Sequence, residues 1–170
     1  MAMKEAISAL NDLVKRGVIK EYAIGGGTAA LAYLEPVLTF DVDVFVVFGD
    51  PDRIDILAPI YSVLTREYDA TYNTEHPETI MVCGVAFQFL EAQDGLLLEA
   101  CRNAKSIDYE GVTVRVFPAE YLMAICLATG RPKDRQRLGM FIAERAYDES
   151  RLIPILKTYS LETKWNEWKV

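Results

Sequence analysis

The sequence predicts an α/β domain followed by a helical C-terminal part. Two runs rich in valine and phenylalanine, 42–48 and 79–91, have the composition of strands buried in a sheet. Around them, apolar residues recur at the three- and four-residue spacing of helices that pack one face on a core. After residue 117 only helical spacing remains. We therefore expect an α/β core at 1–117 and a helical C-terminal extension packed on it at 118–170.

The first half of the chain alternates between helices and strands. Ile7, Leu10, Leu13 and Val14 give residues 3–16 a helical face, and Gly17 can end that helix. The expected elements that follow are a strand at 18–24, a helix at 27–34 that Pro36 breaks, the strand at 42–48, a helix from Pro51 to about Tyr68, a polar loop at 70–79, and two strands at 79–91 that meet at Gly84.

The second half begins with a helix at about 95–104. A hairpin follows, and its turn is Glu110–Gly111, because glycine tolerates the positive φ of a two-residue turn. Pro118 is well placed as the first helical residue of the next helix, and Gly130 fits its end. Residues 132–146 and 149–168 then predict two or three more helices.

Charge and composition limit the possible functions. The chain has 170 residues, half of them hydrophobic, which suits one domain with a real core. Its net charge of -7 argues against a general nucleic-acid coat, although a local basic patch stays possible, and it fits a site that holds divalent cations. The sequence contains no apolar run of membrane-spanning length and no signal-peptide pattern, so we expect a cytoplasmic protein with no membrane partner.

The three cysteines do not suggest a disulfide framework or a zinc site. Cys83, Cys101 and Cys126 are odd in number, far apart in the sequence and set among apolar residues. None forms a C-x-x-C pair. We expect three reduced thiols in the core.

Three consecutive glycines, Gly25, Gly26 and Gly27, stand between the first strand and the next helix. Such a turn exposes backbone N–H groups at a helix N-terminus and lets a phosphate approach closely, and Thr28 can add a hydroxyl donor. A tight structural connection would use the same residues, so the glycines alone leave both interpretations open.

Asp41 and Asp43 stand one residue apart at the start of the strand 42–48. Side chains two residues apart on a strand point to the same face, with Cα atoms roughly 6 to 7 Å apart. Two converging carboxylates repel each other unless a cation lies between them, and oxygen-rich sites of this type suit Mg²⁺ or Mn²⁺. A solvated strand edge is the alternative, but Phe45 and Val47 continue the same face as apolar residues.

Together the two motifs resemble the nucleotidyltransferase superfamily that includes DNA polymerase β. The stretch "GGGTAALAYLEPVLTFDVDVFV" places 13 residues between Gly27 and Asp41. It is similar, more narrowly, to minimal bacterial nucleotidyltransferases related to the toxin component of abortive-infection toxin–antitoxin pairs. The resemblance covers most of residues 20–145, and it implies the nucleotidyltransferase fold, a mixed sheet flanked by helices.

The resemblance also implies roles for the motif residues. Gly25, Gly26, Gly27 and Thr28 would hold the triphosphate of an NTP, and Asp41 and Asp43 would ligate one or two Mg²⁺ or Mn²⁺ ions. Members of the family usually carry a third carboxylate on a neighbouring strand. Here the strand "VAFQFLEA" offers the amide of Gln88, which can bind a metal but cannot act as a general base; Glu91, at the strand end, could substitute only if the strand bends.

The segment "GRPKDRQRL" brings a basic cluster to the C-terminal part. Helical spacing places Arg131 and Arg135 on one face, and Lys133 and Arg137 on another. The resemblance implies that Lys133 binds a phosphate of the nucleotide, with Asp134 holding it in place; an ordinary charged helix face is the alternative.

Two glutamates receive plain structural interpretations. Glu120 lies in the first turn of its helix, where the helix dipole favours a carboxylate. Glu99, on the helix after the strand "VAFQFLEA", is expected to face solvent.

The sequence thus predicts a metal-dependent nucleotidyltransferase that moves an NMP from an NTP to a hydroxyl acceptor. The acceptor is left open among an RNA end, a protein hydroxyl and a small molecule, and a cognate antitoxin is a possible partner. The alternative is a catalytically degenerate member of the same fold that binds nucleotide or a partner protein. A third hypothesis is a purely structural or dimerisation module. The aspartate pair argues against it, because such a module gains no stability from two adjacent negative charges.

Overall fold

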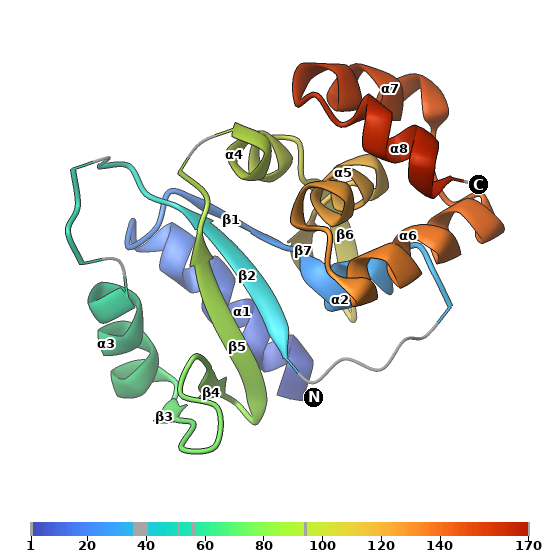
Figure 1. Ribbon diagram of the computed structural model, residues 1–170. Helices are drawn as coiled ribbons and strands as arrows, with labels where there is room; N and C mark the ends of the chain where they lie inside the picture. The colour runs from blue at the N-terminus through green and yellow to red at the C-terminus, as the bar shows by residue number, and fades with distance from the viewer. Residues whose placement is uncertain (1, 36–40, 51, 56, 94, 170) are drawn as a thin grey trace.

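A mixed sheet forms the centre of the molecule. The computed structural model describes residues 2–35, 41–50, 52–55, 57–93 and 95–169. Within them the strands are β1 (Glu21–Ile24), β2 (Val42–Val47), β3 (Thr71–Tyr72), β4 (Ile80–Val82), β5 (Val85–Glu91), β6 (Lys105–Tyr109) and β7 (Val112–Val116). They lie in the order β3-β4-β5-β2-β1-β7-β6 (Figure 1).

Strand β2 lies near the middle of the sheet. It runs antiparallel to β1 on one side and parallel to β5 on the other. The β2–β5 register places Asp43 beside Gln88 and Phe45 beside Leu90. Beyond β1, strand β7 pairs in parallel with it, and β6 pairs antiparallel with β7. The sheet is therefore mixed, as the fold class requires.

Helices flank this sheet and fill the C-terminal part. They are α1 (Ala2–Lys15), α2 (Gly26–Ala30), α3 (Leu57–Glu67), α4 (Gly95–Arg102), α5 (Ala119–Thr129), α6 (Pro132–Glu144), α7 (Glu149–Thr158) and α8 (Glu162–Trp168). Among the helices described, none combines the length and the apolar composition that crossing a bilayer requires.

The two faces of the sheet carry different helices. Tyr22 of β1 donates its hydroxyl to Asn11 of α1, 2.8 Å away, and α1 lies across the sheet in Figure 1. Side chains alternate along a strand, so Glu21 points to the opposite face, where it pairs with Arg115 at 2.9 Å. Arg115 also donates to the carbonyl of Cys101 in α4. Helix α1 thus covers one face and α4 the other.

One hydrophobic cluster runs from α1 through the sheet into the C-terminal helices. Phe117 after β7, Phe141 of α6 and Trp165 of α8 all belong to it and are buried. The rings of Phe141 and Tyr33 lie 6.3 Å apart between centroids, which joins α6 to the segment after α2. The helices after residue 117 therefore share their core with the sheet. The division into units at 1–117 and 118–170 stays a prediction.

Both predicted turns between strands are confirmed. Glu110 and Gly111 have φ values of 51° and 84°, and they connect β6 to β7. Cys83 and Gly84, with φ values of 50° and 82°, connect β4 to β5. Positive φ at two central residues matches the twist of a tight hairpin.

Several element boundaries were predicted wrongly. The helix expected from Pro51 begins at Leu57, where the Asp55 carboxylate accepts a hydrogen bond from the Ala58 N–H at 3.0 Å. A side-chain cap at Asp55 fixes the start of that helix. The loop expected at 70–79 contains strand β3. Pro36 and Pro51 themselves lie outside the described residues.

Smaller differences affect the other helices and the cysteines. The helix expected at 27–34 is the shorter α2. Pro118 is the N-cap of α5 rather than its first helical residue, and Gly130 ends that helix with a φ of 71°. All three cysteines are free, and Cys101 and Cys126 are buried as expected; Cys83 is partly exposed because it lies in the β4–β5 turn.

We expect Phe141→Ala to lower the free energy of unfolding by about 3 to 5 kcal/mol, because it removes a buried ring shared by the sheet and the C-terminal helices. Urea denaturation followed by circular dichroism measures the change, with the exposed Gln136→Ala on the same helix as control. The whole protein should still unfold in one transition. A sheet that keeps its wild-type midpoint while the C-terminal helices melt separately would contradict the shared core.

Candidate functional site

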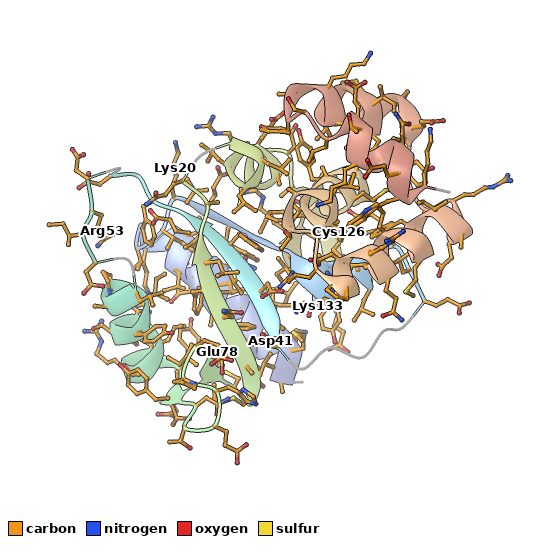
Figure 2. The ribbon with its side chains drawn as sticks, viewed as in Figure 1. Lys20, Asp41, Arg53, Glu78, Cys126 and Lys133 are labelled. Atoms are coloured by element: carbon orange, nitrogen blue, oxygen red, sulfur yellow. The ribbon has the colours of Figure 1, made fainter. Side chains whose placement is uncertain are left out.

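A cavity of about 330 Å³ opens between the sheet and helices α5 and α6. Its polar lining comes from four distant parts of the chain, namely Gly26, Asp41, Asp43, Gln88, Arg131, Lys133, Asp134 and Arg137. Figure 2 shows Asp41 at the start of β2 and Lys133 on α6 in this region. Asp41 and Asp43 thus reach the cavity from the β2 segment, and the C-terminal part supplies its basic groups together with one further carboxylate, Asp134.

Asp41 and Asp43 both line the cavity, as the strand alternation predicts. Gln88, the neighbour of Asp43 in the parallel β2–β5 pairing, lines it as well. Further along β2, Phe45 closes the floor against Phe117, with ring centroids 4.8 Å apart. The carboxylates therefore lie at the cavity end of β2, and the next residue on the same face of the strand, Phe45, belongs to the apolar core.

The environment of Asp43 opposes its ionisation. Burial raises the pKa of Asp43, and the negative charge of Asp41 raises it further. The positive charges of Lys133, Arg137 and Arg131 act in the opposite direction, without cancelling the rise in this pKa. A cation bound between the two carboxylates would relieve the part of their repulsion that the three basic side chains do not offset.

The glycine turn is shaped around side chains of the protein itself. Gly26 has a φ of 57°, and a Cβ there would lie 1.8 Å from Oδ2 of Asp43. A Cβ at Gly25 would lie 2.4 Å from the ring of Phe45. Each glycine is therefore needed for a close approach by a β2 side chain. Gly27, in α2, is buried. Binding of a phosphate by this turn stays a prediction.

Thr28 connects α2 to the start of β2. Its hydroxyl donates to the backbone carbonyl of Asp41 at 3.1 Å. The hydroxyl proton is thus already used within the protein, and the bond fixes the backbone that carries the first carboxylate. Its predicted contact with a phosphate remains untested.

Three cations of the α6 segment line the cavity together, namely Arg131, Lys133 and Arg137. The expectation that Arg131 and Lys133 occupy different faces was wrong, because Arg131 is the N-cap and lies outside the helical repeat. Arg135 does point elsewhere, since its guanidinium lies 5.4 Å from the centroid of the Trp168 ring.

Asp134 holds the arginines of this cluster rather than Lys133. Its side chain is 2 % exposed and accepts from Arg131 at Nε, 2.7 Å, and at Nη2, 3.0 Å. Arg137 lies 3.9 Å away on the other side. Among the described residues, Lys133 has no carboxylate within ion-pair distance. Its ammonium is thus the cation of the cluster best placed to meet a ligand.

Sequence reasoning missed Arg131 and Arg137 as members of the site. The available signal was their spacing, because Arg131, Asp134 and Arg137 recur at every third position with the acid in the centre. Such a pattern favours two ion pairs shared by one carboxylate.

Glu91 does not reach the cavity. The β2–β5 pairing continues in register to the Val46–Glu91 pair, so β5 does not bend. Glu91 lies three positions after Gln88, and this odd offset places its side chain on the opposite face. There it accepts a hydrogen bond from Gln93 Nε2 at 2.5 Å. The β5 side chain that lies beside the aspartates in the cavity is therefore the amide of Gln88.

The donor set fits a metal that is shared with a substrate. No group of three or more His, Cys, Asp or Glu side chains able to hold a metal occurs within the described ranges. Mg²⁺, however, is commonly held by one or two carboxylates together with substrate phosphates and water. Asp41, Asp43 and the amide oxygen of Gln88 are the ligands that the protein can supply to such a site. The phosphate oxygens of a substrate would supply further ligands.

Glu99 differs from its expected role, whereas Glu120 lies in the first turn of α5 as expected and makes a further contact. Glu99 is not a solvent-facing residue, because its carboxylate accepts hydrogen bonds from the hydroxyls of Tyr121 and Tyr159. Glu120 is buried, and its Oε1 accepts from the backbone N–H of Asp148 at 2.8 Å. It therefore ties α5 to the start of α7 in addition to lying in a favourable first turn.

A match to one solved structure supports the fold, and a weaker match accompanies it. An antigenic nucleotidyltransferase-like protein from Paracoccidioides brasiliensis matches 82% of this chain and 75% of its own, with a TM-score of 0.56 and 15% sequence identity. The polyadenylate synthase of Megavirus matches 90% of this chain and 30% of its own, with a TM-score of 0.43 and 14% identity. No protein-family model and no curated protein sequence matches the chain. The chain has the nucleotidyltransferase fold.

The raised pKa of Asp43 predicts a stability change on removing its charge. The native state holds this proton more tightly than the unfolded chain does. Stability therefore falls as pH rises from the usual aspartate pKa through the raised one, and the loss is complete above it. We expect metal-free Asp43→Asn protein to melt at a higher temperature than wild type at neutral pH, and the difference to shrink as pH falls through that window.

Calorimetry in the presence of a chelator measures both melting temperatures. The exposed Asp52→Asn change serves as the matched control, since it removes an aspartate charge outside the cavity. An Asp43→Asn protein that is less stable than wild type at neutral pH would show that ionised Asp43 contributes favourably to the fold.

Proposed function

We propose that this protein transfers a nucleotide from an NTP to a hydroxyl acceptor, with Mg²⁺ or Mn²⁺ as its cofactor. The observation that carries the proposal is the meeting of the Asp41–Asp43 pair with three cations in one cavity of a nucleotidyltransferase fold. An NTP bound with a divalent ion has the complementary charges, because the metal suits the aspartates and the phosphates suit the basic side chains.

The residues divide between metal and phosphates. Asp41 and Asp43 would hold the metal, and the amide oxygen of Gln88 could complete the protein's share of the ligands. The bound metal would neutralise phosphate charge and make the acceptor hydroxyl more acidic. Lys133 would bind a phosphate directly, while Asp134 holds Arg131 and Arg137 in position around it.

The glycine turn completes the proposed phosphate site. The backbone N–H groups of Gly26 and Gly27 at the start of α2 are the donors that remain for a phosphate, because the N–H of Gly25 already donates to the carbonyl of Asp43 at 2.9 Å. Gly26 also lies directly against Asp43. A triphosphate that reached the turn would therefore lie next to the proposed metal ligands.

In the proposed reaction the acceptor oxygen attacks the α-phosphorus of the NTP. The bond from that phosphorus to the oxygen bridging to the β-phosphate breaks, and pyrophosphate leaves. The acceptor proton passes to solvent, because the amide of Gln88 cannot take it. Lys133, Arg131 and Arg137 stabilise the negative charge that develops on the leaving group.

The acceptor is proposed only as a class, that is, an RNA end, a protein hydroxyl or a small molecule. The chain's net charge of -7 disfavours long nucleic acid, and the three cations of the cavity are used by the phosphates of the NTP. The resemblance to the toxin component of abortive-infection pairs makes a cognate antitoxin a proposed protein partner.

One observation favours a second candidate, a degenerate member that binds nucleotide without transferring it. Gln88 lies beside Asp43 in the sheet and lines the same cavity, at the position where a third carboxylate would act on the acceptor. Such a protein would keep the metal and phosphate ligands and would lack only the proton acceptor.

The metal and nucleotide should bind together. At about 100 times its Kd, Mg²⁺ with an α,β-methylene NTP should raise the melting temperature by roughly 5 to 10 °C, whereas either alone should do much less. The reason is that the protein offers two carboxylates, and the phosphates supply the remaining charged ligands. Differential scanning fluorimetry measures the shift.

Asp41→Asn combined with Asp43→Asn should abolish this joint stabilisation, and the exposed Asp52→Asn control should retain it. A full shift in the double variant would place the metal and the nucleotide elsewhere in the molecule.

Gln88→Asp separates the two candidate functions. If the wild type is an enzyme, it should transfer labelled nucleotide slowly, and the new carboxylate should increase the rate, because general-base assistance is worth roughly 100- to 10,000-fold. If the wild type is a binder, it should transfer nothing. Transfer is followed with an α-labelled NTP against RNA, protein and small-molecule acceptors.

The control is Gln93→Asp, which makes the same change at an exposed position just after β5. A Gln88→Asp protein that binds Mg²⁺ and NTP, yet transfers nothing to any acceptor in the screen, would count against the catalytic proposal.

A further inference from the structure

A second cavity, of about 430 Å³, lies between helices α4, α5 and α7. We call it the α4–α7 cavity. Its charged lining consists of Glu99 from α4, Lys105 from β6, Glu120 from α5 and Arg151 from α7. It shares no described lining residue with the cavity of Asp41 and Asp43. Its size falls within the range of sites for small molecules.

Glu120 is the most unusual group of this cavity. The residue is 4% exposed, and its Oε1 accepts from the backbone N–H of Asp148. No described residue donates a hydrogen bond to its other oxygen, Oε2. A carboxylate buried to this degree is costly unless its oxygens are satisfied. Among the described residues the one buried side-chain nitrogen or oxygen without a partner is Nε1 of Trp165, so Oε2 of Glu120 is open to the cavity, where a bound molecule can donate to it.

Glu99 supplies a second, firmly held carboxylate. The hydroxyls of Tyr121 and Tyr159 both donate to it. These bonds and burial raise the pKa of Tyr159 to about 12, so its phenol stays a donor near neutral pH. The carboxylate of Glu99 thus lines the same cavity as Glu120.

The cations of the cavity do not neutralise these carboxylates. Lys105 places its ammonium 5.7 Å from the centroid of the Tyr33 ring, and Arg151 lies 3.7 Å from Asp148. No ion pair in the described part of the chain joins Lys105 or Arg151 to Glu99 or Glu120. The cavity therefore keeps two negative and two positive groups apart across an open space.

We propose that the α4–α7 cavity binds a free α-amino acid. The ammonium group of such a ligand would donate to Oε2 of Glu120 and lie near Glu99, and its carboxylate would meet Lys105 and Arg151. Pro118, Pro154 and Ile155 provide apolar surface for its side chain. A purely cationic ligand would leave the two basic residues without a partner, and a purely anionic one would leave the two carboxylates without one.

The test is isothermal titration calorimetry with each of the twenty common L-amino acids, using the full chain in chelator and without NTP. At least one amino acid should bind saturably with one site per chain. The amine formed by removing its carboxyl group, and its N-acetyl derivative, should each bind roughly 10- to 100-fold more weakly, because each loses one set of charged hydrogen bonds.

Glu120→Gln should weaken binding by a similar roughly 10- to 100-fold, while the amide oxygen still accepts from Asp148. Lys105→Met, at an exposed position on the cavity rim, tests the other end of the ligand without touching the core. Glu75→Gln, in an exposed loop, is the matched control and should bind like wild type. Circular dichroism checks that each variant is folded.

The proposal is overturned if no amino acid binds the wild type, or if binding survives unchanged in both Glu120→Gln and Lys105→Met. Asp41→Asn protein should bind the amino acid normally. This result separates the α4–α7 cavity from the proposed nucleotide site, because loss of nucleotide binding would leave amino-acid binding intact.

Discussion

The architecture of the site depends on the electrostatic cost of placing Asp41 and Asp43 side by side at the start of a buried strand. Burial and mutual repulsion both oppose ionisation, and they raise the pKa of Asp43. The fold responds with three cations from the α6 segment, which lower that pKa only in part. A divalent ion bound by the two carboxylates could relieve the repulsion that these cations do not offset. The same charges that destabilise the metal-free fold are therefore those that a ligand would use, which is a common relation between stability and function.

The C-terminal helices belong to the site as much as the sheet does. Asp134, almost fully buried, holds Arg131 and lies close to Arg137, so that both arginines face the carboxylates across the cavity. Lys133 is left without an ion pair among the described residues. A sheet without α6 would keep the aspartates but lose every basic group that lines the cavity within the described ranges. The shared hydrophobic core fixes the distance between the two sets of charges, because Phe117 and Phe141 belong to one cluster.

The sequence predicts those parts of the structure that depend on local spacing. Alternation along β2 places Asp41 and Asp43 on one face, and the Glu110–Gly111 turn follows from the φ that glycine permits. It fails where a distant contact decides. No local spacing shows that Glu99 lies between Tyr121 and Tyr159, 22 and 60 residues away. The start of α3 was missed because the Asp55 carboxylate, which accepts from the Ala58 N–H, marks the start of the helix.

The repulsion between Asp41 and Asp43 also explains the residues that surround Asp43, namely Gly26 and Gln88. Gly26 has no Cβ where Oδ2 of Asp43 lies, so the carboxylate can sit against the backbone at the start of α2. On its other side the sheet register fixes Gln88 beside Asp43. A carboxylate at position 88 would add a third negative charge to a pair that already repels, and it would raise the pKa of Asp43 further. An amide avoids that cost and keeps an oxygen ligand, but it gives up a proton acceptor. The residue at position 88 therefore sets the balance between the stability of the metal-free fold and the chemistry open to the cavity.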